Sequence, residues 1–192
     1  MRVVVGITGA SGVQYAYRLL QRLVGQAVLI ISEDGKKVIE AETEMNPTEF
    51  AALATAIFTN DDFDSPVASG SSPFDAVVVI PCSMHTLAKI ALGLADNLIT
   101  RAASVALKER RKLILVPRET PLHATHLEHM LKASKMGAII LPAMPAFYHM
   151  PKDIGELLDF IVGRVLDQLG IEHNLIRQWG SETRKPFTEQ ER

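Results

Sequence analysis

Two glycine- and hydroxyl-bearing segments have the residue types that bind an anionic ligand. Residues 6–12 read GITGASG, and the glycines at positions 6, 9 and 12 let a ligand approach the backbone closely. A helix that follows such a loop adds a partial positive charge, so a phosphate would suit this position. The spacing is neither G-x-G-x-x-G nor a Walker loop, and a strand-to-helix turn with a helix cap explains it equally well.

The segment PCSMHT, residues 81–86, repeats this arrangement at the start of another expected helix. Ser83 and Thr86 are spaced either to cap that helix or to bind a polar ligand. From these residues alone, capping is the better interpretation. Two such junctions in one chain nevertheless favour a phosphate or a flavin as the ligand.

Several cations could add to an anion site. Arg101 and Lys108 lie seven residues apart on one expected helix and therefore point the same way. Arg118 and Glu119 directly follow an expected strand. Arg164 lies beside the apolar stripe of the last helix, where a salt bridge to Asp or Glu is the simpler explanation for it.

Tyr148 precedes that last helix, in the apolar segment LPAMPAFYHM. Its phenol, together with the cations, could bind a phosphate that leaves during a reaction. The apolar residues of this segment could face a neighbouring chain or belong to the core.

The elements that must position these residues alternate between strands and helices. Strands are expected at 3–7, 28–32, 75–80, 113–116 and 138–141, and helices at 13–23, 36–44, 48–57, 87–92, 97–110, 125–135 and 153–169. The strands are continuous Val, Ile and Leu runs, which indicates burial on both faces. The sequence therefore predicts a single α/β domain over residues 1–180, followed by a polar tail at 181–192. Its fold would be a Rossmann-like or flavodoxin-like, doubly wound parallel sheet in three layers.

Ligands of such sheets lie beyond the carboxyl ends of the strands, so the loops 8–12, 32–35, 81–86 and 117–125 are the candidate site.

Composition narrows the class of protein. A net charge of −2 argues against nucleic acid and anionic membranes as partners. The single cysteine, Cys82, allows no intrachain disulfide and fits a reducing cytoplasm. We expect no signal peptide and no membrane span. We also expect no metal site, because His123, His126 and His129 lack the spacing of H-E-x-x-H.

With these residues assembled, the chain resembles the UbiX-type flavin prenyltransferases, a group of phenylacrylate decarboxylase-like flavoproteins. The resemblance runs from GITGASG through PCSMHTLAKIALGLADNLITRAASVALKERRKLILVPRETP and HLEHMLKASKMGAIILPAMPAFYH to LGI and RQWG. It implies that FMN is bound by Gly9, Ala10, Ser11, Ser32, Ser83, Met84, His85, Thr86 and Arg118. Some members carry a Trp near the prenyl group before ASGSS, where the nearest aromatic residue here is Phe63.

The resemblance also implies a reaction, in which a dimethylallyl group moves from dimethylallyl phosphate to N5 and C6 of reduced FMN. Tyr148, Arg164 and Lys108 would hold the phosphate, without a metal ion. Arg101 and Glu119 match further active-site positions, with Glu119 as the acid–base group and Ser11 as a proton relay. The prenylated FMN would serve a separate UbiD-type decarboxylase. The family forms large homo-oligomers, often dodecamers, with sites between subunits.

Two other functions remain open from the residues. An FMN-dependent cysteine decarboxylase would share the fold but would rely on a histidine near the first helix, and no histidine precedes His85. A non-catalytic subunit that carries FMN to a decarboxylase would need the FMN loops but not the cluster of cations.

Overall fold

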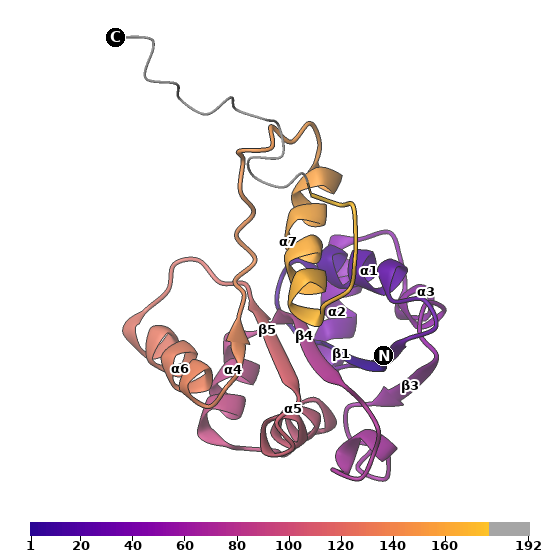
Figure 1. The fold of residues 1–192 in the computed structure, drawn as a ribbon, viewed down its shortest axis with the longest axis vertical. Coiled ribbons are helices and arrows are strands. Elements are labelled where there is room, and N and C mark those ends of the chain that lie inside the picture. The colour runs from indigo at the N-terminus through magenta and orange to yellow at the C-terminus, as the bar shows by residue number, and fades with distance from the viewer. Residues whose placement is uncertain (177–192) are drawn as a thin grey trace, which may run out of the picture.

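Six parallel strands form one sheet between two layers of helices in the computed structural model, which describes residues 1–176 (Figure 1). The strand order is β3-β2-β1-β4-β5-β6. The strands are β1 (Val3–Ile7), β2 (Ala27–Ile31), β3 (Ala56–Thr59), β4 (Ala76–Cys82), β5 (Lys112–Pro117) and β6 (Ile139–Ile140). The chain winds from β1 toward β3 and then returns to the other side of β1, so β1 and β4 flank the point where the winding reverses.

The helices divide between the two faces of the sheet, as Figure 1 shows. One face is covered by α1 (Val13–Arg22), α2 (Glu33–Glu42), α3 (Pro47–Ala51) and α7 (Ile154–Leu169). The other is covered by α4 (Met84–Leu92), α5 (Leu98–Lys108), α6 (Ala124–Lys135) and the short 3₁₀ helix η1 (Pro66–Ala68). The predicted three-layer, doubly wound parallel fold is confirmed.

Both faces of the central strands are buried. In β1, Val3 and Val5 pack on the α1 and α7 side, whereas Val4 packs on the α4 and α5 side. Successive side chains of a strand point to opposite faces, so a strand covered on both sides must be apolar throughout. The continuous apolar runs of the sequence thus have the predicted cause.

The expected helix at 48–57 is wrong beyond Ala51. There α3 ends, and residues 56–59 form β3 at the edge of the sheet. Only alternate residues of β3 are partly buried, so it lacks the continuous apolar run that marks the central strands. In addition, α2 begins three residues earlier than expected, at Glu33, because the Ser32 side chain caps it.

No helix among residues 1–176 is both long and apolar enough to cross a membrane. The RQWG motif at 177–180 and the predicted tail at 181–192 lie outside the described residues.

Candidate functional site

A cavity of about 620 Å³ lies at the carboxyl ends of β1, β2 and β4, where the winding of the sheet reverses. This is the position at which open α/β sheets bind their ligands. Its lining comprises Thr8, Gly9, Ser32, Glu33, Asp34, Asn60, Asp61, Phe63, Ser83, His85, Thr86, Lys89, Asp96 and Asn97. Five of the residues predicted to bind FMN therefore meet here, and Phe63 joins them.

The buried Thr8 side chain holds the ends of β1 and β4 together. Its hydroxyl donates to the Pro81 carbonyl at 2.8 Å and accepts the Ser83 N–H at 2.8 Å. These two bonds fix the start of α4 beside the first loop. The Thr8 hydroxyl therefore bonds to the protein both as donor and as acceptor.

The start of α4 is the part of the cavity best suited to an anion. The Ser83 hydroxyl accepts the Thr86 N–H at 3.2 Å, so the predicted capping role is confirmed. The first turn contains no acidic residue. In the described part of the chain, the N–H groups of Met84 and His85 have no protein acceptor, and they add to the partial positive charge of the helix end.

The start of α2 differs because it carries acids. The Ser32 hydroxyl caps it by accepting the Gly35 N–H at 3.0 Å, and Glu33 and Asp34 occupy the first turn. Lysines pair with these acids and with Asp96 across the cavity: Lys36 with Glu33 at 2.6 Å, Lys37 with Asp34 at 2.9 Å, and Lys89 with Asp96 at 2.7 Å. Hydrogen bonds from Lys37 and Lys89 lower the pKa of Asp34 and Asp96, so both carboxylates stay ionised and paired.

Glu42, at the end of α2, occupies the helix start where a phosphate was considered. Its Oε2 accepts the N–H of Gly12 at 2.8 Å and that of Val13 at 3.4 Å, which caps α1. Gly12 has a φ of 104°, a conformation that favours glycine. The helix-cap interpretation of GITGASG is therefore the one that the structure bears out. Sequence reasoning missed Glu42, because the residue that caps α1 lies thirty positions away.

The first loop connects this cap with the cavity. Gly9 lines the cavity, and Ala10 and Ser11 lie between Gly9 and the capped Gly12. Ala10 is buried and Ser11 is partly exposed. Of the predicted FMN-binding residues of this loop, Gly9 therefore lines the cavity, and Ala10 and Ser11 follow it toward the start of α1.

The start of α5 also lies at the cavity, but its N–H groups are bound within the protein. The Asn97 Oδ1 accepts the Thr100 N–H at 3.0 Å, and the Asn60 Oδ1 accepts the Ile99 N–H at 3.0 Å. Of the four helices that begin around the cavity, α4 is thus the one with free N–H groups and no acid.

Arg118 and Glu119 follow β5 at the same edge of the sheet, next to the end of β4. The backbone N–H of Arg118 donates to the Cys82 carbonyl at 3.4 Å. The side-chain Nε of Arg118 is buried and has no hydrogen-bond partner among the described residues. Glu119 is exposed, and its carboxylate accepts the Thr120 N–H at 3.1 Å.

Arg101 and Lys108 do not reach the cavity of their own chain. Arg101 turns toward η1, where its Nε donates to the Ala68 carbonyl at 2.8 Å. Lys108 ends α5 and pairs with Glu109. At 1.5 Å per residue, eleven residues place Lys108 about 16 Å from the cavity end of the helix.

Tyr148 and Arg164 lie on the α7 side of the molecule. The Tyr148 ring is 45% exposed and meets the Phe160 ring edge-on at 5.9 Å. Phe160 and Arg164 are one helical turn apart, so they share a side of α7. Arg164 is paired with Asp167 at 2.6 Å, the salt bridge that the sequence offered as the simpler explanation.

No group of three His, Cys, Asp or Glu side chains among residues 1–176 could hold a metal ion. Cys82 is fully buried, and burial raises the pKa of its thiol to about 12, so the thiolate form is strongly disfavoured. Cys82 is therefore a small residue of the core.

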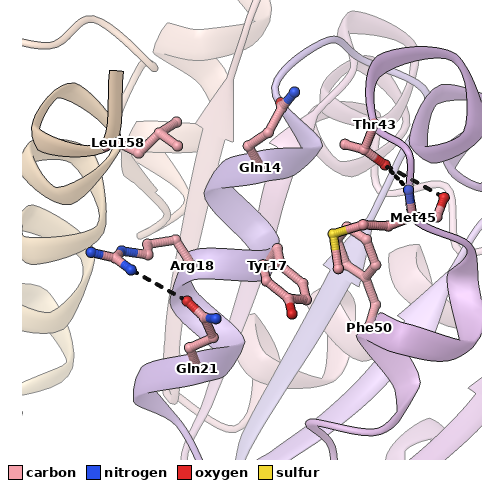
Figure 2. Close-up of a pocket in the computed structure, with 9 residues that line it drawn as sticks. Gln14, Tyr17, Arg18, Gln21, Thr43, Met45, Phe50 and Leu158 are labelled. Atoms are coloured by element: carbon pink, nitrogen blue, oxygen red, sulfur yellow. Dashed lines mark hydrogen bonds between the residues drawn. The ribbon is translucent and has the colours of Figure 1, made fainter. Parts of the chain in front are cut away.

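A second cavity, of about 320 Å³, lies between α1, α3 and α7 (Figure 2). Tyr17 and Phe50 form its aromatic wall, with ring centroids 5.0 Å apart. Arg18 is the one charged lining residue, and Asp159 binds its guanidinium through two bonds of 2.6 and 2.8 Å. This cavity therefore lacks a free charged group, and the cavity at the strand ends is the candidate functional site.

Comparisons with known proteins agree with that choice. The Flavoprotein family model matches residues 1–166. A flavin prenyltransferase UbiX from Methanocaldococcus jannaschii is 55% identical over 183 residues, covering 94% of this chain and 100% of that protein. A dodecameric FMN-dependent UbiX-like decarboxylase from Escherichia coli O157:H7 has a TM-score of 0.91 at 46% identity, covering 93% of this chain and 99% of that one. AnUbiX (PadA1), solved in complex with FMN and dimethylallyl pyrophosphate, has a TM-score of 0.90 at 42% identity, covering 93% and 96%.

Proposed function

Because this chain belongs to the flavoprotein family and, within it, to the UbiX-type flavin prenyltransferases, we propose that it joins a dimethylallyl group to N5 and C6 of reduced FMN. Dimethylallyl phosphate is the proposed donor, and inorganic phosphate leaves. The observation that carries the proposal is the polar cavity at the strand ends, where one helix start is open to a phosphate.

The residues around the cavity fit FMN in a defined orientation. Glu42 caps α1, acids crowd the start of α2, and asparagines cap α5, which leaves the start of α4 for the FMN phosphate. Ser83, His85 and Thr86 would then contact the phosphate, with Ser32 across the cavity. The loop Gly9–Ser11 would face the isoalloxazine ring.

Arg118 supports the same orientation. A buried guanidinium Nε without a partner is costly, and a polar ligand would satisfy it. Arg118 follows β5, which pairs with β4, the strand that leads into α4. Its side chain would therefore bind FMN near the start of α4.

The prenyl phosphate would be bound by side chains from more than one copy of the chain. Arg101 turns away toward η1, and Lys108 lies at the far end of α5, so neither lines the cavity of its own subunit. A homo-oligomer, proposed here to be a dodecamer, would bring them to a neighbour's site. Exposed apolar side chains between residues 144 and 154 support such assembly, since a surface of this kind marks an interface. They are Met144, Phe147, Met150 and Ile154.

The chemistry then divides among the chain's own residues. Reduced FMN supplies the nucleophilic N5 and C6 positions. Lys108 and Arg164 would stabilise charge on the departing phosphate, and the Tyr148 phenol would donate a hydrogen bond to it. Removing one such donor from a dry site costs roughly 3 kcal/mol of transition-state stabilisation. The aromatic face of Phe63, at the cavity, would shield the allylic cation.

Proton transfer falls to Glu119 and Ser11. Glu119 is exposed at the strand-end edge in the isolated chain, where it can accept or return a proton once substrates enclose it. Ser11 lies next to the loop end that Glu42 holds, so its hydroxyl is positioned to relay a proton.

The recipient of the product and the cellular compartment complete the proposed function. We propose that prenylated FMN passes to a UbiD-type decarboxylase, and that the protein works in the cytoplasm. The free, buried Cys82 is compatible with a reducing compartment.

The test is incubation of the purified protein with reduced FMN and either dimethylallyl phosphate or dimethylallyl diphosphate, followed by mass spectrometry. The proposal predicts a flavin heavier by one C₅H₈ unit with the monophosphate, and the same yield when a chelator is added. A cysteine decarboxylase would instead release CO₂ from a cysteine substrate. An FMN carrier would return unmodified flavin with either donor.

A further inference from the structure

Residues 65–74 form a segment, called the strap here, that contacts α5. It includes η1, and Val67 and Phe74 anchor it in the core with 2% exposure each. Between these anchors, Ser69 and Ser71 are exposed and their hydroxyls lie 2.9 Å apart. The middle of the strap is therefore a surface loop held at its two ends.

Arginine side chains bind three alternate carbonyls of the strap. Arg101 Nε donates to Ala68 at 2.8 Å, as described above. Arg111 donates from Nη2 to Gly70 at 2.7 Å and from Nη1 to Ser72 at 2.8 Å. The Arg111 guanidinium also lies over the Phe74 ring, 4.3 Å from its centroid. One side chain thus fixes three points of the strap, and only a planar fork of donors can do so.

Lys108 rests on the part of the strap that Arg111 holds. A Cβ atom at Gly70 would collide with the Lys108 Nζ and the Glu109 carboxylate, which shows how closely this ion pair packs on the strap backbone. The Lys108 hydrogen bond lowers the pKa of Glu109, so the pair stays charged. If the Gly70 carbonyl were released, the surface under Lys108 would move.

We propose that Arg111 is a positioning residue for the prenyl donor, acting through the strap to hold Lys108 and Arg101 in one fixed arrangement. The inference rests on the proposed function, in which these two cations bind the donor phosphate. Arg111 itself touches neither substrate. Its bonds to Gly70 and Ser72 keep the strap from moving, and reactions that depend on orientation lose up to about 10²-fold in rate for an error of about 1 Å.

The test compares Arg111→Lys with Arg110→Lys, a matched control at the exposed neighbouring arginine. Lysine keeps the charge but lacks the planar fork that spans the Gly70 and Ser72 carbonyls while lying over the Phe74 ring. Arg111→Lys should raise the KM for dimethylallyl phosphate at least tenfold, with unchanged FMN affinity. Hydrogen–deuterium exchange in peptides that cover residues 68–74 should become faster. Arg110→Lys should alter neither quantity. Arg111→Gln serves as a second variant and should show the same pattern as Arg111→Lys.

An unchanged KM, or wild-type exchange in the strap, would overturn the inference. A parallel loss of FMN affinity and melting temperature would overturn it too, because Arg111 would then support the fold in general. Absence of prenylated flavin from the wild-type protein would overturn the proposed function and this inference with it. Normal wild-type turnover beside an unaltered Arg111→Lys variant would overturn the inference alone.

Discussion

Replacing Glu42 with alanine measures what the remote cap contributes to the first loop. The substitution removes one bond of 2.8 Å and one of 3.4 Å from a carboxylate to the N–H groups of Gly12 and Val13. A hydrogen bond to a charged group contributes roughly 1.5–3 kcal/mol, and an anion at a helix start adds about 0.5 kcal/mol. Because the second bond is long, we expect a loss of about 2 kcal/mol in the free energy of unfolding.

For a chain of this length, about 2 kcal/mol corresponds to a fall in melting temperature of roughly 4–8 °C. The assay is thermal unfolding followed by circular dichroism, at fixed protein and FMN concentrations, because ligand and assembly both shift the midpoint. Glu42→Gln keeps an acceptor oxygen, so its melting temperature should fall by about half as much as that of Glu42→Ala. The control is Glu44→Ala, at an exposed position two residues on, which should stay within about 2 °C. A Glu42→Ala midpoint equal to that of the control would refute the capping argument.

Three further predictions concern the site and the core. Glu119→Gln should bind FMN normally in a fluorescence titration but form little prenylated flavin by mass spectrometry, and normal turnover would remove Glu119 from the mechanism. Arg164→Ala should need more dimethylallyl phosphate for half-maximal rate and should lower kcat by about 10²-fold without weakening FMN binding, whereas identical donor dependence would contradict its role. Cys82, with its thiol pKa raised by burial to about 12, should resist a thiol reagent at pH 8 and react in denaturant; labelling of the folded protein would disprove its burial.

The fold was predictable wherever burial left a continuous apolar signal. The run Val3–Ile7 is apolar on both faces because helices cover both sides of β1. At the edge of the sheet that signal fails, because β3 has only alternate residues partly buried and its sequence pattern predicts a helix instead. Caps explain why α2 and α4 each begin three residues earlier than expected, since Ser32 and Ser83 start them before the apolar stripe of each helix begins.

The residues of the site were likewise predictable where their role depends on neighbours in the sequence, and not where it depends on distant residues. Ser83 and Thr86 were identifiable because hydroxyls at the start of a helix have a local meaning, whereas Ser32 followed only from the family resemblance. Glu42 carried no local signal, because its partners lie at the start of another helix. For Arg101 and Lys108, helical spacing correctly placed both on one helix, but direction along α5 takes Lys108 away from the cavity. Sequence spacing identifies a face of a helix but does not specify what that face contacts.

The exposed apolar segment between residues 144 and 154 bears on how the protein is made. Phe147, Met150 and Ile154 are 68%, 80% and 74% exposed. Exposed apolar side chains do little harm to an isolated chain, but at high protein concentration they promote association between chains. A newly synthesised chain can therefore form its complete sheet and still expose an apolar surface that is prone to aggregation. In the proposed homo-oligomer, assembly would be the last step of maturation, and the yield of active protein would depend on how fast subunits associate before they aggregate.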